Sequence, residues 1–400
     1  MNISQPTCAS TAHVLHYMFT EPILMNICMP CDPNKPYNDL PALPPAAELD
    51  SKAILKASMP SRIAVAELRL AGQLIPDQSV LINTIPLLEA KDSSEIENIV
   101  TTNDALFREA SHADDGNDAA AKEAVRYRAA IYSGIQSLQT RPLTARTAAE
   151  VCSQIKGVDL DIRTTPGTTL RNSFTGEVIY TPPEGAERLR ELLANWEQFA
   201  NTADDLDPLV RMAVLHYQFE AIHPFIDGNG RTGRILNILA LIQAGLLEIP
   251  TLYLSRHIVR TKGQYYALLQ GVTQRGEWEP WVLYMLTAVE STAKWTNARI
   301  HAIRDLMENT AAYVRANADS IYSWELIETI FAQPYTRISH LADRGIAKRV
   351  AASRYLKQLA AIGVLEEEKV GRDKLFIHRK YMQLLGSEGH EFERYPGTST

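Results

Sequence analysis

The chain has 400 residues, of which 46% are hydrophobic and 22% are charged, as is ordinary for a soluble globular protein. Its formal net charge of −7 argues against nucleic acid as the partner of the whole chain, and no apolar run is long enough to span a membrane. Only four cysteines occur, which argues against a disulfide framework and is typical of a reducing, cytoplasmic location.

Residues 1–34 have few charges and no clear hydrophobic period, so we expect them to form a flexible N-terminal tail. Cys28 and Cys31 form a single C-x-x-C pair there. A zinc or redox site would need a second pair or a strand-helix context, and neither is present. Five prolines then predict an extended entry segment: Pro33, Pro36, Pro41, Pro44 and Pro45.

Residues 35–115 are predicted to form an N-terminal helical region with two patterned segments. In the first, residues 51–74, apolar side chains recur at roughly helical spacing at Ile54, Leu55, Ile63, Ala66 and Leu70. The second, residues 86–110, is expected to bury the stripe Ile96, Ile99, Val100 and Leu106. A polar, alanine-rich connection that starts at residue 112 ends this region.

Residues 116–290 are predicted to form a central domain that is almost entirely helical. Its expected helices are 119–138, 141–155, 186–201, 208–222, 232–245, 257–275 and 278–310. Asp207 followed by Pro208 supplies an N-cap and a proline at the first helical position. Residues 166–185 differ, because a Thr175-Gly176 turn and closing prolines flank alternating apolar residues. That pattern predicts a β-hairpin.

Residues 291–400 change in character and are predicted to form a winged-helix domain with a C-terminal tail. Three short helices are expected at 323–331, 337–344 and 350–362, followed by two strands around a turn at 371–373. From Tyr335 to Lys380 there are 11 Lys or Arg against 5 Asp or Glu, a local charge of +6. A basic winged helix can bind DNA, but many such domains bind proteins instead.

Residues 223–234 read HPFIDGNGRTGR and concentrate reactive groups between two expected helices. Gly228 and Gly230 permit backbone conformations closed to other residues, and they precede a helix whose first N–H groups form a ready anion site. Arg231 and Arg234 are three residues apart, so both can face the same anion. This part of the chain therefore predicts a phosphate-binding loop.

Asp227 would repel a phosphate in that loop unless a cation lay between them. Mg²⁺ held by one carboxylate and by phosphate oxygens resolves the conflict. His223, with an ordinary pKa of about 6.5, is suited to take a proton from an attacking hydroxyl. Together these residues indicate metal-assisted transfer from a polyphosphate.

Other interpretations of this stretch are open. Its glycines fit the G-x-G-x-x-G dinucleotide fingerprint, and Glu248 lies at the expected distance, but a helix rather than a strand precedes them. His216, His223 and Asp227 could hold a structural metal, although a fourth ligand is missing. An ordinary helix start would explain the arginines, but not the histidine, the aspartate and the glycines together.

The stretch resembles the signature of the Fic family, H-x-F-x-[D/E]-G-N-G-R-x-x-R, with all eight specified positions filled. Fic proteins are helical and mostly transfer AMP from ATP to a Ser, Thr or Tyr hydroxyl of a target protein. The resemblance implies that His223 is the general base and that Asp227 holds Mg²⁺ between the α- and β-phosphates. It implies a nucleotide-binding set of Asp227, Gly228, Asn229, Gly230, Arg231, Thr232, Gly233 and Arg234. The lysine of the related kinase-like branch is absent.

The resemblance extends to two other segments. The hairpin residues Glu177, Val178, Ile179 and Tyr180 are similar to the Fic flap, which holds the target segment by strand addition. Tyr265 and Tyr266 match paired aromatics that stack near adenine, although core packing would explain either residue as well. The fold class is therefore mainly α: a helical Fic core with a β-hairpin flap, plus a C-terminal winged-helix domain.

An inhibitory motif is also expected. Fic proteins are often restrained by a helix carrying [S/T]-x-x-x-E-[G/N], and Ser93, Glu97 and Asn98 fit it. Glu97 paired with Arg234 would occupy the guanidinium that should grip the γ-phosphate. A capping box, Ser94-x-x-Glu97, is the alternative, because it explains both side chains by helix-end chemistry.

The sequence thus predicts an autoinhibited protein adenylyltransferase that modifies target proteins and itself, with ATP as substrate and Mg²⁺ as cofactor. One rival is a DNA-binding winged-helix regulator with a Fic-like core. Another is a Fic enzyme that uses a different nucleotide or removes AMP, with Glu97 positioning a water. A homodimer is an expectation from the family alone, and no membrane contact is expected.

Overall fold

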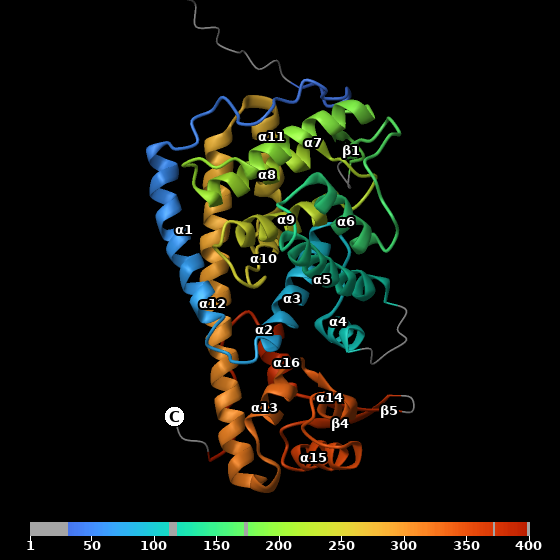
Figure 1. Ribbon diagram of the computed structural model, residues 1–400, viewed down its shortest axis with the longest axis vertical. Coiled ribbons are helices and arrows are strands. Elements are labelled where there is room, and N and C mark those ends of the chain that lie inside the picture. Colours follow the sequence, from blue (N-terminus) through green and yellow to red (C-terminus); the bar gives the residue numbers. More distant parts are fainter. Residues whose placement is uncertain (1–30, 112–117, 172–174, 371–372, 398–400) are drawn as a thin grey trace, which may run out of the picture.

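A 40-residue helix, α12 (Trp278–Asn317), runs along most of the long axis of the molecule (Figure 1). At 1.5 Å per residue it is about 60 Å long. The computed structural model describes residues 31–111, 118–171, 175–370 and 373–397. Within them, no helix is both long and apolar enough to cross a membrane. Most of the predicted tail, including Cys28, lies outside the described residues.

Two groups of helices surround the upper part of α12 (Figure 1). The N-terminal group is α1 (Lys52–Ala71), α2 (Ser79–Ile82), α3 (Ile85–Ile96) and α4 (Asn103–Ala110). The second group is α5 (Ala119–Leu138), α6 (Ala145–Lys156), α7 (Ala186–Asn201), α8 (Pro208–Ile222), α9 (Asn229–Gln243), α10 (Ser255–Arg260) and α11 (Lys262–Arg275). The prediction of a mainly helical fold is confirmed.

The central helix α9 is buried along almost its whole length, from Asn229 to Leu241. It begins three residues before the predicted start, because Gly228 has a left-handed backbone (φ 87°) that allows the chain to turn directly into the helix. The preceding helix α8 starts as predicted, with the Asp207 side chain accepting a hydrogen bond from the Leu209 N–H. These two helices fix the ends of the 223–234 loop.

The predicted hairpin is present as β1 (Leu170–Arg171) and β2 (Val178–Tyr180), which pair antiparallel with Leu170 opposite Tyr180. The entry segment before α1 packs against the end of this hairpin. The Tyr37 N–H donates to the Thr181 carbonyl at 3.0 Å, and the Tyr37 and Tyr180 rings meet edge to face.

The second N-terminal segment differs from the prediction. The chain leaves the helix after Ile96 and starts α4 at Asn103, so the expected continuous stripe is broken. Ile96 and Leu106 are buried, but Val100 lies between the helices and is 69% exposed. The break follows from Asn98, whose left-handed backbone (φ 62°) ends the helix. A similar break at Thr261 divides the predicted 257–275 helix into α10 and α11.

Apolar residues at helical spacing usually mark the buried face of a helix, but in α1 most of those identified above face solvent. The helix is present, but Leu55, Ile63 and Leu70 are 54%, 59% and 63% exposed. Its buried face instead combines small or polar residues with three larger apolar ones. The buried residues are Ile54, Ser58, Ser61, Ala64, Val65, Leu68 and Ala71. That inner face packs along α12 (Figure 1).

The predicted domain boundary at residue 290 falls inside α12, so this helix continues from the central domain into the C-terminal domain. It continues with η1 (Asp319–Ile321), α13 (Trp324–Phe331), β3 (Tyr335–Thr336), α14 (Ile338–Asp343), α15 (Arg349–Ala361), β4 (Glu366–Val370), β5 (Asp373–Ile377) and α16 (Arg379–Gly386). The strands form an antiparallel sheet in the order β3-β5-β4. Three helices followed by two paired strands are the elements that the winged-helix interpretation requires.

This C-terminal domain contacts the N-terminal helices at two points. The Arg108 guanidinium on α4 donates two hydrogen bonds, of 3.0 and 2.9 Å, to the Glu368 carboxylate on β4. Arg344, at the end of α14, donates to Asp77 just before α2 at 2.6 Å. The chain carrying α3 is therefore tied to the C-terminal domain on both sides.

Candidate functional site

The 223–234 loop is held in shape by its own backbone and by one asparagine. His223 ends α8 in a left-handed conformation (φ 50°), which is uncommon for a residue other than glycine. The Asn229 side chain accepts from the Phe225 N–H and donates to the Phe225 carbonyl, both at 2.8 Å. Phe225 is buried against Phe219. The loop is thus closed on itself before α9 begins.

His223 lies partly buried at the junction of α8 and the loop. Burial, together with the nearby positive charge of Arg163, lowers its pKa to about 4, against the opposite effects of Glu97 and Asp227. The imidazole is therefore neutral at pH 7 and has a free electron pair on one ring nitrogen. A neutral imidazole at the mouth of an anion-binding loop can accept a proton.

Arg163 is a residue of this site that the sequence reasoning missed. It lies in the segment between α6 and β1 and is only 3% exposed. Its Nε donates to the His223 carbonyl at 2.8 Å, and its terminal nitrogen donates to the Pro183 carbonyl at the base of the hairpin. Its backbone N–H also donates to the Pro224 carbonyl at 2.8 Å. No local pattern in the sequence marks this arginine, because its partners are all backbone groups distant in sequence.

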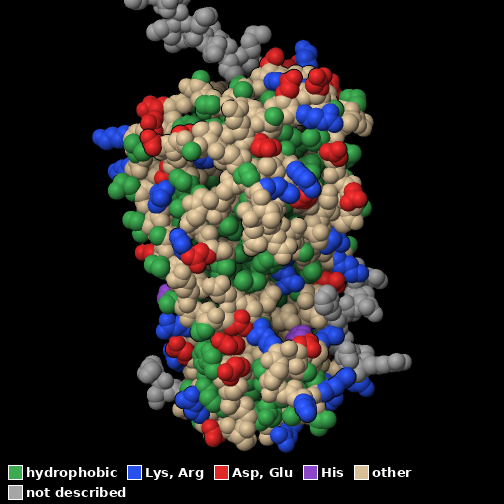
Figure 2. Space-filling model, viewed as in Figure 1, with side chains coloured by type: hydrophobic (Ala, Val, Ile, Leu, Met, Phe, Trp, Pro, Cys, Tyr) green, Lys and Arg blue, Asp and Glu red, His purple; other side chains and the backbone are tan. Residues whose placement is uncertain are grey.

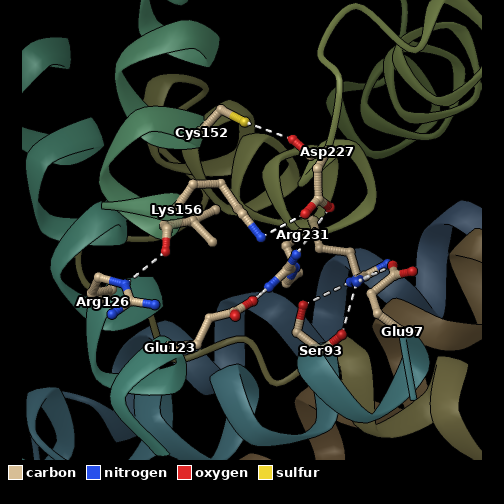
Figure 3. Close-up of polar contacts among 10 residues, drawn as sticks. Ser93, Glu97, Glu123, Arg126, Cys152, Lys156, Asp227 and Arg231 are labelled. Atoms are coloured by element: carbon tan, nitrogen blue, oxygen red, sulfur yellow. Dashed lines mark hydrogen bonds and ion pairs between the residues drawn. The ribbon is translucent and has the colours of Figure 1, made fainter. Parts of the chain in front are cut away.

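Asp227 stands at the outer side of the loop, with 60% of its side chain exposed. One carboxylate oxygen pairs with the Lys156 ammonium at the end of α6, at 2.6 Å, and the other lies 3.5 Å from Arg231 (Figure 3). Its backbone carbonyl accepts from the Cys152 thiol. Two cationic side chains, Lys156 and Arg231, thus contact this carboxylate, which is turned toward solvent.

Arg231 is almost completely buried and pairs with Glu123 of α5 as well as with Asp227 (Figure 3). Glu123 was not predicted as part of the site. Its position on a helix more than 100 residues away in sequence left no signal for pairing with the loop. The arrangement places Arg231 in a chain of alternating charges that runs from Glu123 to Lys156.

Arg234 is 1% exposed and is held entirely by α3 and the residue that follows it. Its Nε donates to the Ser93 hydroxyl, and one terminal nitrogen donates to both the Ser93 carbonyl and the Glu97 carboxylate. All three contacts measure 2.8 Å. Figure 3 shows Ser93 and Glu97 projecting from this helix toward the loop. The structure therefore brings the two predicted inhibitory residues to Arg234.

The Glu97 carboxylate lies directly over the glycine turn. A Cβ atom added to Gly230 would come within 2.3 Å of a Glu97 oxygen, so the close approach requires glycine at this position. Burial raises the pKa of Glu97, but the Arg234 guanidinium, with Arg231 and His223, lowers it by more, so the net shift is downward. The carboxylate is charged and lies at the N-terminal end of α9, against Gly230 and Arg234.

The end of α3 decides between the two interpretations of this motif. Ser94 and Glu97 lie at the C-terminal end of the helix, not at its start, and the helix begins nine residues earlier at Ile85. The capping-box alternative is therefore wrong. Asn98 is needed for another reason: its left-handed backbone lets the Ile99 N–H reach the Ser94 carbonyl at 3.0 Å. Its side chain also accepts from Lys262 at 3.0 Å.

The two remaining loop positions pack inward. Thr232 is fully buried. A Cβ atom on Gly233 would lie 2.7 Å from a Glu220 oxygen, so this glycine makes room for a carboxylate from α8. Burial raises the pKa of Glu220 to about 7, opposed by the positive charge of Arg234. Glu220 is a second acidic group near Arg234 that the sequence reasoning did not identify.

The two tyrosines predicted to lie near adenine, Tyr265 and Tyr266, differ in their exposure to solvent. Tyr265 is 1% exposed, and its hydroxyl is hydrogen-bonded to His216 Nε2 at 2.9 Å, so it belongs to the core. Tyr266 is 43% exposed.

The second ring nitrogen of His216 is hydrogen-bonded to the Asn237 amide at 3.1 Å, so His216 has no nitrogen left for a metal. The structural-metal alternative is therefore wrong.

The hairpin residues also divide by exposure. Glu177 and Ile179 face outward, with Ile179 41% exposed, and Val178 is partly buried. Tyr180 is an anchor: its hydroxyl donates to the Ala221 carbonyl on α8 at 2.9 Å. One edge residue of the hairpin thus ties it to the helix that ends at His223.

Two further tests concern cofactors. The dinucleotide-fold alternative is wrong, because a helix, α8, and not a strand precedes the glycines. Glu248 instead forms an ion pair with Arg69 at 2.6 Å. In the described ranges, no group of three or more His, Cys, Asp or Glu side chains could hold a metal by itself. Asp227 nevertheless fits Mg²⁺ bound jointly with phosphate oxygens, because its exposed carboxylate lies beside the start of α9.

Known proteins resemble this chain along most of its length. Family models match residues 55–136 (Fic/DOC family N-terminal), 153–241 (Fic/DOC family) and 306–381 (Protein adenylyltransferase SoFic-like, C-terminal domain). The protein adenylyltransferase fic-1 of Caenorhabditis elegans is 31% identical over 148 residues, which are 37% of this chain and 26% of that protein. Protein adenylyltransferase Fic of Drosophila mojavensis is 29% identical over 139 residues, or 34% of this chain and 26% of that protein.

These matches cover only about a quarter of the length of the two relatives. A crystal structure of a Fic family protein from Desulfovibrio desulfuricans G20 has the same fold, with a TM-score of 0.51 and 20% identity. It covers 82% of this chain and 96% of that chain. The Fic/DOC matches follow one another in order along the sequence, and the motif loop lies inside one of them. This chain belongs to the Fic/DOC family.

Proposed function

We propose that this protein is an autoinhibited protein adenylyltransferase, which transfers AMP from ATP to a hydroxyl side chain of target proteins and of itself. The observation that carries the proposal is the loop between α8 and α9. It combines a neutral histidine, a glycine-based anion site and two buried arginines within twelve residues. The names of the matched relatives support the same reaction.

In the proposed reaction, His223 takes the proton from the target hydroxyl as its oxygen attacks the α-phosphorus. A new P–O bond forms to the target, the bond between the α- and β-phosphates breaks, and pyrophosphate leaves. Because the pKa of His223 is lowered to about 4, the base is already deprotonated at pH 7. Its left-handed backbone and the Arg163 contact to its carbonyl fix the position of the imidazole.

The phosphates would lie at the start of α9, where Gly228 and Gly230 leave backbone N–H groups open to an anion. Arg231 and Arg234 would neutralise the β- and γ-phosphates, and the exposed Tyr266 is the better candidate of the pair to stack on adenine. Mg²⁺, when bound, would neutralise negative charge on the phosphates. Asp227 would hold it, with Lys156 released from its present ion pair.

The hairpin would hold the target. Glu177 and Ile179 are exposed, and Tyr180 would keep the hairpin fixed to α8 while an extended target segment pairs with the edge of the hairpin. Strand addition uses main-chain hydrogen bonds, so many target sequences would fit.

Inhibition would result from the contacts of Arg234. With Glu97 on one terminal nitrogen, the guanidinium cannot grip the γ-phosphate. A nucleotide bound without that contact would have its α-phosphorus out of line with the attacking oxygen.

One experiment tests the reaction itself. The Glu97→Gly variant is incubated with lysate and with ATP that is labelled at either the α- or the γ-phosphate. AMP transfer predicts protein-bound label from α-labelled ATP only. Label from the γ-position would instead indicate phosphoryl transfer. Loss of label from a protein that already carries labelled AMP would indicate that the enzyme removes AMP. Substitution of the other labelled nucleotides for ATP tests whether adenine is the preferred base.

Replacing Arg163 with glutamine is expected to slow transfer roughly 10- to 100-fold, because the base loses its fixed position. Burial and then Arg163 lower the pKa of His223, so removal of this positive charge raises that pKa. The acid limb of the rate-pH profile, measured in the Glu97→Gly background, should therefore move to higher pH. Arg163→Lys keeps the charge but not the forked contacts, so it should slow the reaction and leave the limb in place. If both variants only lose thermal stability, Arg163 has a purely structural role.

A second candidate function rests on α15. This helix contains no Asp or Glu, and its cationic residues Arg349, Arg354 and Lys357 are exposed, as is Lys348 just before it. That surface fits a DNA backbone. The rest of the module is less basic than its composition suggests, because Glu366 and Glu367 pair with Arg379 and Lys374.

A gel shift in low salt tests this candidate. If DNA binds through α15, charge reversal at Arg349 and Lys357 should weaken the shift and reduce its salt dependence by about one unit of slope for each lost phosphate contact. Charge reversal of the exposed Lys52 on α1 is the matched control. A shift that all variants retain would exclude this surface.

A further inference from the structure

Three arginines gather around one carboxylate where α10 and α12 meet the segment that follows α16. Arg256 and Arg260 lie on α10, and Arg299 lies on α12. One oxygen of Glu388, just beyond the end of α16, accepts hydrogen bonds from Arg256, at 2.7 Å, and from Arg260. Figure 2 shows Lys and Arg side chains mixed with Asp and Glu over the face in view, so three arginines around one acid are not typical of that face.

Arg299 is buried with part of its hydrogen-bonding capacity unused. Its side chain is 0% exposed. One terminal nitrogen donates to the Ser387 and Gly389 carbonyls, at 2.7 and 2.9 Å. Its Nε and its other terminal nitrogen are buried and have no hydrogen-bond partner among the described residues. Unpaired N–H groups of a buried charge are costly, so they favour an oxygen atom that the chain itself does not supply.

The cluster carries more positive charge than its ion pairs neutralise. Within the described ranges, Glu388 is the only carboxylate that forms an ion pair with any of the three arginines. The guanidinium carbons of Arg256 and Arg299 lie 4.2 and 4.6 Å from the centre of the Trp295 ring, which stabilises part of their charge. Burial, followed by the positive charge of Arg256, still lowers the pKa of Arg299 to about 10. The arginines thus repel one another, and an added anion would relieve this repulsion.

We propose that this cluster binds a phosphate group, which takes the place of the Glu388 carboxylate between the arginines. Guanidinium groups pair their N–H donors with two phosphate oxygens at once, and a dianion offsets several arginines better than one carboxylate does. The Glu388 side chain is 74% exposed and lies outside any helix or strand, so it can turn away without disturbing either helix. The ligand is a free phosphate ion or a small molecule with a terminal phosphate.

The cluster is separate from the loop between α8 and α9. Trp295 meets Tyr253 edge to face, and the Tyr253 hydroxyl donates to Asp92 of α3 at 2.6 Å. The next residue of α3, Ser93, is instead hydrogen-bonded to Arg234. The two sites therefore contact α3 through different residues, and a phosphate at the cluster would not occupy the loop.

Calorimetric titration of the full chain with inorganic phosphate, at constant ionic strength set with chloride, tests the site. Glu388→Gln removes the competing charge and keeps all three arginines, so it should raise the affinity for phosphate about two- to tenfold. Replacing Arg256 and Arg260 with glutamine in this background should lower it at least about tenfold. The matched controls are Glu308→Gln and Arg304→Gln, which change an exposed ion pair on α12 and should leave the affinity unaltered.

The Glu388→Gln variant separates binding from a purely structural role. If Glu388 only fastens the segment after α16 to the core, the variant should lose thermal stability and bind phosphate no better than the wild type. That result would overturn the proposal, and so would an equal rise in affinity for chloride, which would indicate charge screening alone. This comparison holds even if the arginine variants fail to fold.

Titration with glycerol phosphate distinguishes the two sources of the phosphate group. Tighter binding of the ester than of inorganic phosphate, lost when Arg256 and Arg260 are replaced, would assign a phosphate monoester. Tighter binding of inorganic phosphate would assign the free ion. None of these measurements depends on adenylyl transfer, so the test stands apart from the proposed catalytic activity.

Discussion

Replacing Glu97 with glycine is expected to raise self-labelling with α-labelled ATP by roughly 10- to 100-fold. A hydrogen bond to a charged group contributes about 1.5–3 kcal/mol, and each 1.4 kcal/mol corresponds to about a factor of ten. The variant removes the carboxylate from the Arg234 guanidinium and from the space above Gly230. Both the γ-phosphate contact and the anion site would then be open. The measurement is the initial rate of protein-bound label.

The fold should tolerate this change. Arg234 keeps its two hydrogen bonds to Ser93, so its buried charge is not left without partners. Residue 97 lies just beyond the last turn of α3, where glycine costs little. Glu95→Gly is the matched control, because Glu95 lies two residues away and pairs only with Lys91. Equal labelling by wild type and the Glu97 variant would show that Glu97 does not inhibit the enzyme.

Replacing His223 is expected to lower the rate of transfer by a factor of about 10² to 10⁴ in the Glu97→Gly background. The neighbouring arginines donate protons rather than accept them, and in the proposed reaction the Asp227 carboxylate would hold Mg²⁺. Two substitutions should be compared. His223→Ala removes the imidazole, and His223→Asn removes its basicity while tolerating the left-handed backbone at this position.

Nucleotide binding should persist in both variants, because His223 contributes nothing to the phosphate contacts. Calorimetric titration with Mg-ATP separates this outcome from unfolding. His301→Ala changes an exposed histidine on α12 and should leave the rate unaltered. Retained transfer in the His223 variants would mean that another group is the base, and the proposed mechanism would fail.

The sequence predicted best those features that depend on neighbours close along the chain. The loop from His223 to Arg234 is one continuous stretch, so its chemistry could be inferred from residue types and spacing. The caps of α8 and the turn of the hairpin are also local, and both were found where they were expected. Family resemblance then extended the reading to Glu97, whose contact with Arg234 spans 137 positions.

Features that depend on distant partners were not predictable in this way. Arg163 binds backbone carbonyls, which every residue has, so its sequence context gives no indication of its role. Glu123 reaches Arg231 only because α5 packs beside α9. Which face of α1 turns to solvent also required the structure, because both faces carry apolar residues and packing against α12 decides which of them is buried.

The contacts of Arg234 have a consequence for how the activity responds to concentration. Ser93 and Glu97 belong to the same chain as Arg234, so an inhibitory carboxylate at this position would act as a tethered ligand with a fixed effective concentration. Dilution of the protein would not dissociate it. The γ-phosphate of ATP would meet this carboxylate at any protein concentration, so the nucleotide level, and not the amount of protein, would set how often Arg234 is free to bind it.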